Sequence, residues 1–219
     1  MTLQGLAPHT NLIFEDISKL ECLKEYTLVG GTALSLQINT RQSEDLDFMK
    51  WQQTKSSPCE VSWPTIQQEL ETIGNIDSID ILGLDHVIFV LNGVKISFYS
   101  APRRKIATMT EVSILNNIKA ADIESIGIMK MEVLMRRNKF RDYYDIYSIL
   151  KAGKNINTII AGSLEHSDHK LKSKNLMAMI TNGSLFSKDA QFAQLNPVYD
   201  ITPTDIQEYI KTLLLVNKR

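Results

Sequence analysis

The sequence has few of the residues that define specialised classes of protein. Its 219 residues include two cysteines, Cys22 and Cys59, which form no CxxC pair. This pattern argues against a disulfide framework or a zinc ribbon and suits a reducing compartment. Ten glycines and six prolines are too few for a disordered or collagen-like chain. Lysine and arginine total 24 against 25 acidic residues, a net charge of −1 that excludes nucleic-acid binding through bulk positive charge but leaves a local basic patch open.

Long apolar runs are also absent from the sequence. No stretch approaches the roughly 18 uninterrupted apolar residues of a membrane span, and the first twenty residues lack the basic and apolar regions of a signal peptide. We therefore expect a soluble cytoplasmic protein with no membrane partner. The length and a hydrophobic fraction of 43% suit one large domain, or a core with a small helical addition.

The residue pattern changes near residue 115. Before it, β-branched and aromatic strands alternate with short helices, and Asn92-Gly93 is a strong hairpin signal because type I′ turns need positive φ. After it, helical periodicity dominates. We predict an α/β core over 1–115 and a helical domain over 116–219 packed against it, since no Gly/Ser-rich linker separates them. The expected helices are 14–25, 32–38, 64–73, 122–150, 155–164, 168–181 and 203–217, and the expected strands are 26–29, 45–51, 76–84, 86–91 and 94–100.

Two glycines and a hydroxyl follow the first expected strand. In the run LVGGT, Gly30, Gly31 and Thr32 open the next helix. Glycine lets a phosphate approach the backbone, and the free N–H groups of a first helical turn point toward it. A strand–Gly–Gly–helix turn also occurs without any ligand, so the segment alone leaves both interpretations open.

Two aspartates stand at alternate positions of the next expected strand. In the run SEDLDF, Asp45 and Asp47 face the same side, with Leu46 and Phe48 on the other. Neighbouring carboxylates repel each other unless a cation lies between them, and oxygen ligands suit Mg²⁺ or Mn²⁺. The alternative is a solvated strand face.

A third candidate is a charged stretch from Lys130 to Asp145. On one continuous helix Lys130, Arg137, Arg141 and Asp145 would form one stripe. The stripe would bind phosphate or serve as a salt-bridged surface. Asn138 is a point where the helix could end, and then the stripe would not form.

Together these segments resemble one known family. LVGGTALSLQINTRQSEDLDF and DIESIGIMKMEVLMRRNKFRDYYDIYSIL closely resemble the nucleotidyltransferase AbiEii family, abortive-infection toxins within the DNA polymerase β-like superfamily. The resemblance covers about residues 28–151. It depends on the combination of GGTAL, R-x-S-x-DLDF and K-x6-R-x3-RD-x2-D, because each part alone is unspecific.

The resemblance implies an α+β fold, in which a polymerase β-like core with a small mixed sheet precedes a helical domain that closes the nucleotide cleft. It implies a nucleoside triphosphate as substrate, a divalent metal held by Asp45 and Asp47, and a lysine, Lys130, near the phosphates. The implied catalytic residues are Asp45, Asp47, Lys130, Asp142 and Asp145, and the implied nucleotide-binding residues are Gly30, Gly31, Thr32, Arg41, Ser43, Arg137 and Arg141.

One position departs from the superfamily pattern. Polymerase β-like transferases usually carry a third carboxylate on a later strand, and the aligned residue in VKISFYS is Ser97. Serine is a poor metal ligand and a poor base, so Asp142 or Asp145 becomes the candidate base. Two hypotheses follow: an active transferase that modifies an RNA 3′ end such as that of tRNA, a protein or a small molecule, or a degenerate nucleotide-binding module acting through a partner. A toxin role with a cognate antitoxin is compatible with both.

Overall fold

The computed structural model describes residues 3–52, 54, 56–102, 109–167, 171–188 and 190–216. The chain divides into two compact units, Met1–Asp122 and Ile123–Arg219. The division lies later than the predicted boundary at residue 115, because that boundary falls within a hairpin of β6 (Glu111–Leu115) and β7 (Ile118–Ala121). The β7 strand pairs with β1 (Thr27–Val29), so the hairpin belongs to the sheet of the first unit.

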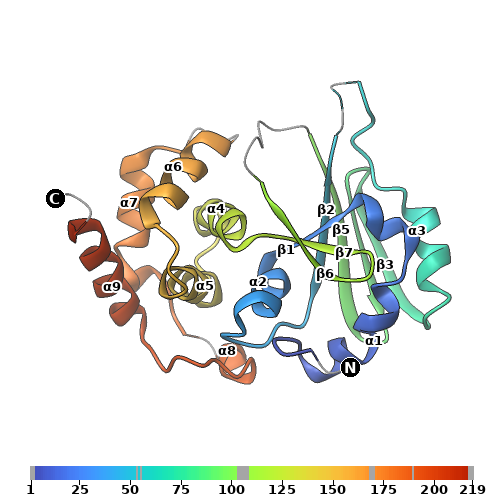
Figure 1. The fold of residues 1–219 in the computed structure, drawn as a ribbon, viewed down its shortest axis with the longest axis horizontal. Coiled ribbons are helices and arrows are strands. Elements are labelled where there is room, and N and C mark those ends of the chain that lie inside the picture. Colours follow the sequence, from blue (N-terminus) through green and yellow to red (C-terminus); the bar gives the residue numbers. More distant parts are fainter. Residues whose placement is uncertain are drawn as a thin grey trace. The chain divides into compact units, whose positions relative to one another are not determined.

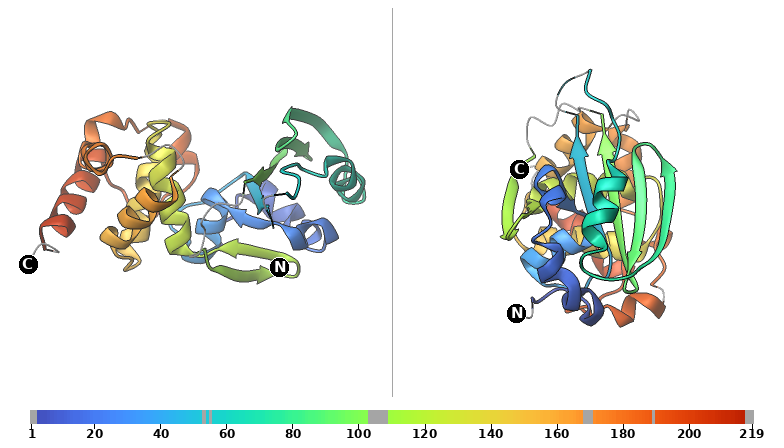
Figure 2. Two further views of the ribbon diagram at one scale, coloured as in Figure 1. Left: turned by 90° about the horizontal axis from the view of Figure 1, so that it is seen from above. Right: turned by 90° about the vertical axis from the view of Figure 1, so that its right-hand side faces the viewer.

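The first unit is built on one mixed sheet (Figure 1). Among the described residues, the strand order is β3-β4-β5-β2-β1-β7-β6. The β2–β5 and β1–β7 pairs are parallel, and the other pairs are antiparallel. Figure 2 shows the β6–β7 hairpin along one edge, in yellow-green. The remaining strands are β2 (Leu46–Trp51), β3 (Ile76–Gly83), β4 (His86–Leu91) and β5 (Val94–Ala101), and the helices are α1 (Pro8–Ile17), the 3₁₀ helix η1 (Glu21–Glu25), α2 (Gly30–Ile38) and α3 (Trp63–Leu70).

The two faces of this sheet differ in burial. Phe48, Phe89 and Phe98 are buried on one face, where their rings contact one another across three strands. The helices α1 and α3 lie on one side of the sheet in Figure 1. Residues at alternate positions, such as Asp47 and Tyr99, are only partly buried. Successive side chains in a strand point to opposite faces, so the sequence period of two creates one core face and one accessible face.

Several sequence predictions about this unit are confirmed. The fold is α+β with a small mixed sheet, as the resemblance implied. Asn92 and Gly93 have φ of 49° and 75°, as a type I′ turn between β4 and β5 requires. The predicted helix over 14–25 is wrong, because α1 ends at Ile17 and η1 begins at Glu21. The Ser18 hydroxyl donates to the Glu15 carbonyl at 2.6 Å, a local bond that competes with helix continuation.

Helices are the main regular elements of the described part of the second unit, which also contains one isolated β-bridge. The expected helix over 122–150 is interrupted, since α4 ends at Leu134 and α5 begins at Phe140. Lys139 is extended and forms a β-bridge with Ser187, which fixes the interruption. Helices α4 and α6 approach closely at Gly127, where a Cβ atom would lie 3.0 Å from Ile159 Cδ1. The helices are α4 (Ile123–Leu134), α5 (Phe140–Lys151), α6 (Ile156–His166), α7 (Ser173–Ile180), the 3₁₀ helix η2 (Gly183–Leu185), α8 (Ala190–Gln194) and α9 (Pro203–Val216).

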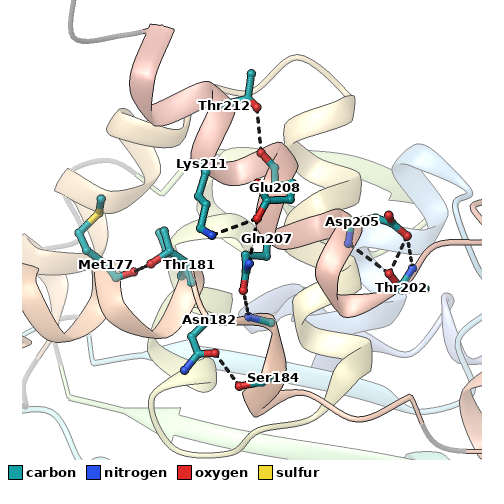
Figure 3. Close-up of polar contacts among 12 residues, drawn as sticks. Met177, Thr181, Asn182, Ser184, Thr202, Asp205, Gln207, Glu208, Lys211 and Thr212 are labelled. Atoms are coloured by element: carbon teal, nitrogen blue, oxygen red, sulfur yellow. Dashed lines mark hydrogen bonds and ion pairs between the residues drawn. The ribbon is translucent and has the colours of Figure 1, made fainter.

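The start of α9 at Pro203 agrees with the prediction, and Figure 3 shows the bonds that hold this helix. Thr202 and Asp205 exchange hydrogen bonds, with the Thr202 hydroxyl donating to Asp205 Oδ2 at 2.7 Å and the Asp205 N–H donating back at 3.2 Å. This reciprocal arrangement satisfies free N–H groups at the helix start. Gln207 accepts a bond from the Gly183 N–H at 2.8 Å and so ties α9 to η2. The predicted helix 168–181 begins at Ser173, and residues 168–170 lie outside the described residues.

Candidate active site

The turn between β1 and α2 lies directly against Asp47. Val29 pairs with Asp47 in the antiparallel β1–β2 ladder. Gly30 follows with φ of 75°, a left-handed conformation that glycine adopts at little cost. A Cβ atom on Gly30 would lie 2.9 Å from Asp47 Oδ2. The sequence therefore needs glycine at this position for two reasons, its backbone conformation and its proximity to a carboxylate.

Arg41 and Ser43 support the turn from within the unit. Arg41 is 4% exposed and Ser43 is 7% exposed. A Cβ atom on Gly31 would lie 2.6 Å from Arg41 Nη2, so the guanidinium packs against the turn. The Thr32 hydroxyl is hydrogen-bonded to the Ser43 hydroxyl at 2.8 Å and to the Asp45 carbonyl. These contacts give Arg41, Ser43 and Thr32 a positioning role, whereas direct contact with a nucleotide stays a prediction.

The N-terminal segment also supports the acidic pair, which the sequence patterns did not indicate. Leu6 forms a parallel β-bridge with Ser43. The Ala7 N–H donates to the Ser43 carbonyl, and the Ser43 N–H donates to the Gly5 carbonyl, each at 2.9 Å. The Thr10 hydroxyl donates to the Glu44 carbonyl at 2.6 Å. The pairing through Gly5 and Ala7 depends on main-chain groups alone, so no side-chain motif could have signalled it.

The acidic pair stands at the beginning of β2, on the accessible face of the sheet. Asp45 immediately precedes the strand and Asp47 is its second residue, and both are partly exposed. Asp47 pairs with Ser97 across the parallel β2–β5 ladder. Ser97 is fully buried, and its hydroxyl has no hydrogen-bond partner among the described residues. The register thus puts a neutral serine on the strand next to Asp47, where the superfamily pattern expects a carboxylate.

The donor set fits a magnesium-type cation. Within the described residues, no group of three or more His, Cys, Asp or Glu side chains could hold a metal ion. Mg²⁺ in phosphoryl-transfer sites is commonly held by one or two carboxylates, with substrate phosphates and water completing its shell. Asp45 and Asp47 are both partly exposed, and Asp47 lies against the Gly30 turn, so the two carboxylates fit that requirement.

The charged residues of the second unit form a buried ion-pair network. Lys130 Nζ on α4 lies 2.7 Å from Asp142 Oδ1 and 2.7 Å from Asp145 Oδ2, both on α5. The Arg137 guanidinium donates to Asp142 through Nε at 2.8 Å and Nη2 at 3.1 Å. The Lys130 side chain is 7% exposed and that of Asp142 is fully buried, whereas Arg137 is 46% exposed. We define Lys130, Arg137, Asp142 and Asp145 as the α4–α5 ion cluster.

The charge state of Asp142 follows from this cluster. Burial disfavours its charged form, but Lys130 and Arg137 outweigh burial and lower the pKa of Asp142 to about 2. A carboxylate with such a low pKa, bonded to two cations, is a weak proton acceptor at pH 7. The contacts thus favour a positioning role for Asp142 over the role of base.

The single-helix stripe predicted from Lys130, Arg137, Arg141 and Asp145 is wrong. The break after Leu134 puts Lys130 on one helix and Asp145 on another, with Arg137 between them. Ion pairs nevertheless bring these residues together. Lys130 pairs with both Asp142 and Asp145, and Arg137 pairs with Asp142. Arg141 is exposed, one residue before Asp142. Sequence spacing identified the right residues but the wrong geometry.

The contact between Gly30 and Asp47 gives a testable consequence. Gly30→Ala is expected to lower the free energy of unfolding by about 1–2 kcal/mol, because a left-handed non-glycine residue is strained, and to lower nucleotidyl transfer by displacing Asp47. Gly93→Ala is the matched control, since Gly93 also has φ of 75° but no atom lies within 4 Å of its would-be Cβ. Urea unfolding and label transfer measure the two effects. Equal transfer activity in both variants would show that the Gly30–Asp47 contact is dispensable.

The glycine turn set against an aspartate pair, in the order β1, α2, β2, is the arrangement of a nucleotidyltransferase. A family model described as the nucleotidyl transferase AbiEii toxin of type IV toxin–antitoxin systems matches residues 12–218, and the chain belongs to this family. The resemblance stated from the motifs is thereby confirmed.

Two further similarities concern less of the chain. The uncharacterized protein aq_aa25 of Aquifex aeolicus (strain VF5) is 23% identical over 137 residues, which cover 63% of this chain and 63% of that protein. The crystal structure of the Megavirus polyadenylate synthase is similar with a TM-score of 0.46 and 14% identity, over 64% of this chain and 30% of that one. Separately, no helix within the described residues is long and apolar enough to cross a membrane.

Proposed function

We propose that the protein transfers a nucleoside monophosphate from a nucleoside triphosphate to a hydroxyl acceptor, with Mg²⁺ or Mn²⁺ held by Asp45 and Asp47. The observation that carries the proposal is the placement of Asp47 against the left-handed Gly30 turn. This placement supports a site in which the Asp47 carboxylate lies beside the backbone N–H groups that begin α2. A metal bound by the carboxylates would neutralise phosphate charge and polarise the α-phosphate.

The chain's own residues supply position and charge for this reaction. The α2 N-terminus offers backbone N–H groups to the triphosphate, since α2 has no side-chain cap. Thr32, Arg41 and Ser43 hold the turn and the acidic segment in register. In this proposal Lys130, Arg137 and Arg141 balance the phosphate charge. Asp142 and Asp145 hold the Lys130 ammonium group in place.

The acceptor and the biological role are further parts of the proposal. The acceptor hydroxyl belongs to an RNA 3′ end such as that of tRNA, to a protein or to a small molecule. Membership of a toxin family supports a toxin whose effect a cognate antitoxin opposes. We expect the reaction in the cytoplasm, where nucleoside triphosphates are abundant.

A second candidate is a nucleotide-binding module without chemistry. It is favoured by Ser97, whose buried hydroxyl stands beside Asp47 in place of a carboxylate. Such a module would bind a nucleotide and act through a partner protein.

A labelling experiment separates the two candidates. Purified protein is incubated with each of four α-labelled nucleoside triphosphates, Mg²⁺ or Mn²⁺, total RNA and cell protein. We expect label in RNA or protein with at least one nucleotide, and a fall to background when EDTA removes the metal, because two carboxylates alone would then repel the triphosphate. Full transfer in EDTA would contradict metal dependence. Nucleotide binding without transfer would support the binding module.

A further inference from the structure

The strand β3 forms one edge of the sheet and carries a group of exposed apolar side chains. Among the described residues it pairs only with β4, so no strand lies along its other side. Ile81, Leu82 and the following Leu84 are 52%, 64% and 76% exposed. In the described part of the chain eight large apolar side chains are exposed, and these are three of them. A single exposed leucine needs no explanation, but a group of them on an unpaired strand marks an interaction surface.

The apolar core face of the sheet continues to this edge. Ile79 and Ile81 pair with Phe89 and Val87 on β4, which are both fully buried. Directly paired residues share a face of the sheet, so Ile81 extends the core face to a position where nothing covers half of its surface. A further strand beside β3 would bury this side chain and enlarge the core.

Both ends of β3 are anchored to the first unit. At its start, Asp77 Oδ2 accepts a hydrogen bond from the Gly93 N–H at 2.9 Å. Just beyond its end, the Leu84 carbonyl accepts one from the Val61 N–H at 2.7 Å. The main-chain groups on the side of β3 that faces away from β4 are therefore already ordered. An extended peptide can bond to such groups and add a strand to the sheet, and the ordering lowers the entropic cost of binding.

The charges on this edge restrict what can occupy it. From residue 76 to 85 the charged side chains are Asp77, Asp80 and Asp85, with no lysine or arginine. Asp80 is exposed in the middle of β3. These acids repel nucleic acids and anionic membrane surfaces. A second copy of β3 would bring three more aspartates to the same edge, and like charges on paired strands are destabilising. A strand that carries lysine or arginine is attracted instead.

We propose that the β3 edge is a docking site for an extended basic segment of a partner protein, which pairs with β3 as an added strand. Apolar side chains of the segment cover Ile81 and Leu82, and its lysine or arginine side chains face Asp80. The aspartate thus has two effects, because it opposes pairing between copies of this chain and selects a basic partner.

The docking site is separate from the candidate active site. It lies at the edge of the sheet opposite the β6–β7 hairpin (Figure 2), and β4 and β5 stand between it and β2, which carries Asp47. Three strand spacings amount to about 14 Å. The inference therefore does not depend on the proposed function.

The test uses two fluorescent eight-residue peptides as probes, one alternating lysine and valine and the other alternating glutamate and valine. Fluorescence anisotropy measures their binding to the full chain at low salt. We expect the lysine peptide to bind at least about tenfold more tightly, because its charges face Asp80 while the valines of both peptides contact Ile81. Hydrogen exchange measured by mass spectrometry is expected to slow in residues 76–84 when the lysine peptide is bound.

Two variants with matched controls locate the binding. Asp80→Lys is expected to reverse the preference between the peptides, whereas Asp16→Lys, the same change of charge at an exposed position of α1, leaves it unchanged. Ile81→Ser is expected to weaken binding of the lysine peptide about tenfold. Leu12→Ser is its control, since Leu12 is 82% exposed on α1. All four side chains are exposed, so the variants keep the fold, which circular dichroism checks.

The other outcomes overturn the proposal. They are binding of neither peptide, equal binding of both, binding that Asp80→Lys and Ile81→Ser leave unchanged, and slower exchange confined to residues outside 76–84. Sedimentation equilibrium tests a second copy as the occupant. We expect the wild type and Ile81→Ser to have the same association state, and a wild-type dimer that Ile81→Ser dissociates would show that a second copy occupies the edge. None of these measurements requires nucleotidyl transfer, so failure of the proposed function leaves them unaffected.

Discussion

Replacing Asp47 with asparagine is expected to lower nucleotidyl transfer about 1,000-fold while the fold is retained. The amide has no charge with which to hold a divalent cation. The negative charge that develops on the phosphate during transfer is then no longer neutralised. The fold survives because Asp47 is partly exposed and stands at the accessible face of β2. Label transfer measures activity, and circular dichroism with thermal unfolding measures folding.

Asp16→Asn is the matched control for this variant. Asp16 is an aspartate of the same unit whose side chain is 62% exposed and pairs with Lys19 at the surface. It is expected to transfer at the wild-type rate. If Asp47→Asn also retained full transfer with an intact fold, the acidic pair would not be the metal site.

The same pair of variants tests whether the chemistry underlies the proposed toxin role. Expression of the wild type or Asp16→Asn is expected to arrest growth, and expression of Asp47→Asn is expected to be harmless. Growth arrest by all three proteins would show that toxicity does not depend on nucleotidyl transfer.

Replacing Lys130 with methionine is expected to destabilise the helical unit by about 3–5 kcal/mol. Methionine fills a similar volume but leaves the buried carboxylates of Asp142 and Asp145 without the ammonium group that both contact at 2.7 Å. Arg137 still bonds to Asp142 and moderates the effect. Urea unfolding followed by far-ultraviolet circular dichroism measures the change. Tryptophan fluorescence serves as an internal reference, since Trp51 and Trp63 both lie in the first unit.

This loss of stability depends on pH in a defined direction. The folded state holds the pKa of Asp142 at about 2, below its ordinary value of 3.8. In the wild type, the stabilising contribution of this group is full above pH 3.8 and is lost as the pH falls toward 2, a change of about 2 kcal/mol. In Lys130→Met, the carboxylates of Asp142 and Asp145 lack the lysine cation at neutral pH. At low pH both groups become protonated and no longer need a cation. The difference between the two proteins is therefore largest at pH 7 and shrinks toward pH 3.

Lys211→Met provides the comparison for a surface pair. Lys211 lies 3.0 Å from Glu208 on α9 (Figure 3), with side chains 42% and 62% exposed. Solvent screens such a pair, so its loss is expected to leave the free energy of unfolding nearly unchanged. Equal destabilisation by Lys130→Met and Lys211→Met would mean that burial of the α4–α5 ion cluster has no energetic consequence.

Local patterns predicted the elements that hold the acidic pair. The run LVGGT and the alternation in DLDF depend on neighbouring residues, and the structure has β1, α2 and β2 where these patterns put them. The Asn92-Gly93 turn was predictable for the same reason, because its backbone conformation follows from residue type. The β6–β7 hairpin was missed, since its strands are short and β7 pairs with β1, which is distant in the sequence.

Contacts between distant segments could not be predicted from spacing. Lys130 and Asp142 belong to two helices, and between these helices Lys139 pairs with Ser187, a residue far along the chain. The pairing of His86 with Tyr99 depends on the register of β4 and β5, which the hairpin turn sets.

The backbone pairing of residues 5–7 with Ser43, together with the bond from the Thr10 hydroxyl to Glu44, has a practical consequence for handling the protein. Affinity tags are often joined to the first residue, and proteases often trim the first few. Here the loss of Gly5 or Ala7 would remove hydrogen bonds to Ser43, just ahead of Asp45. Activity assays therefore need a protein in which residues 5–10 are intact.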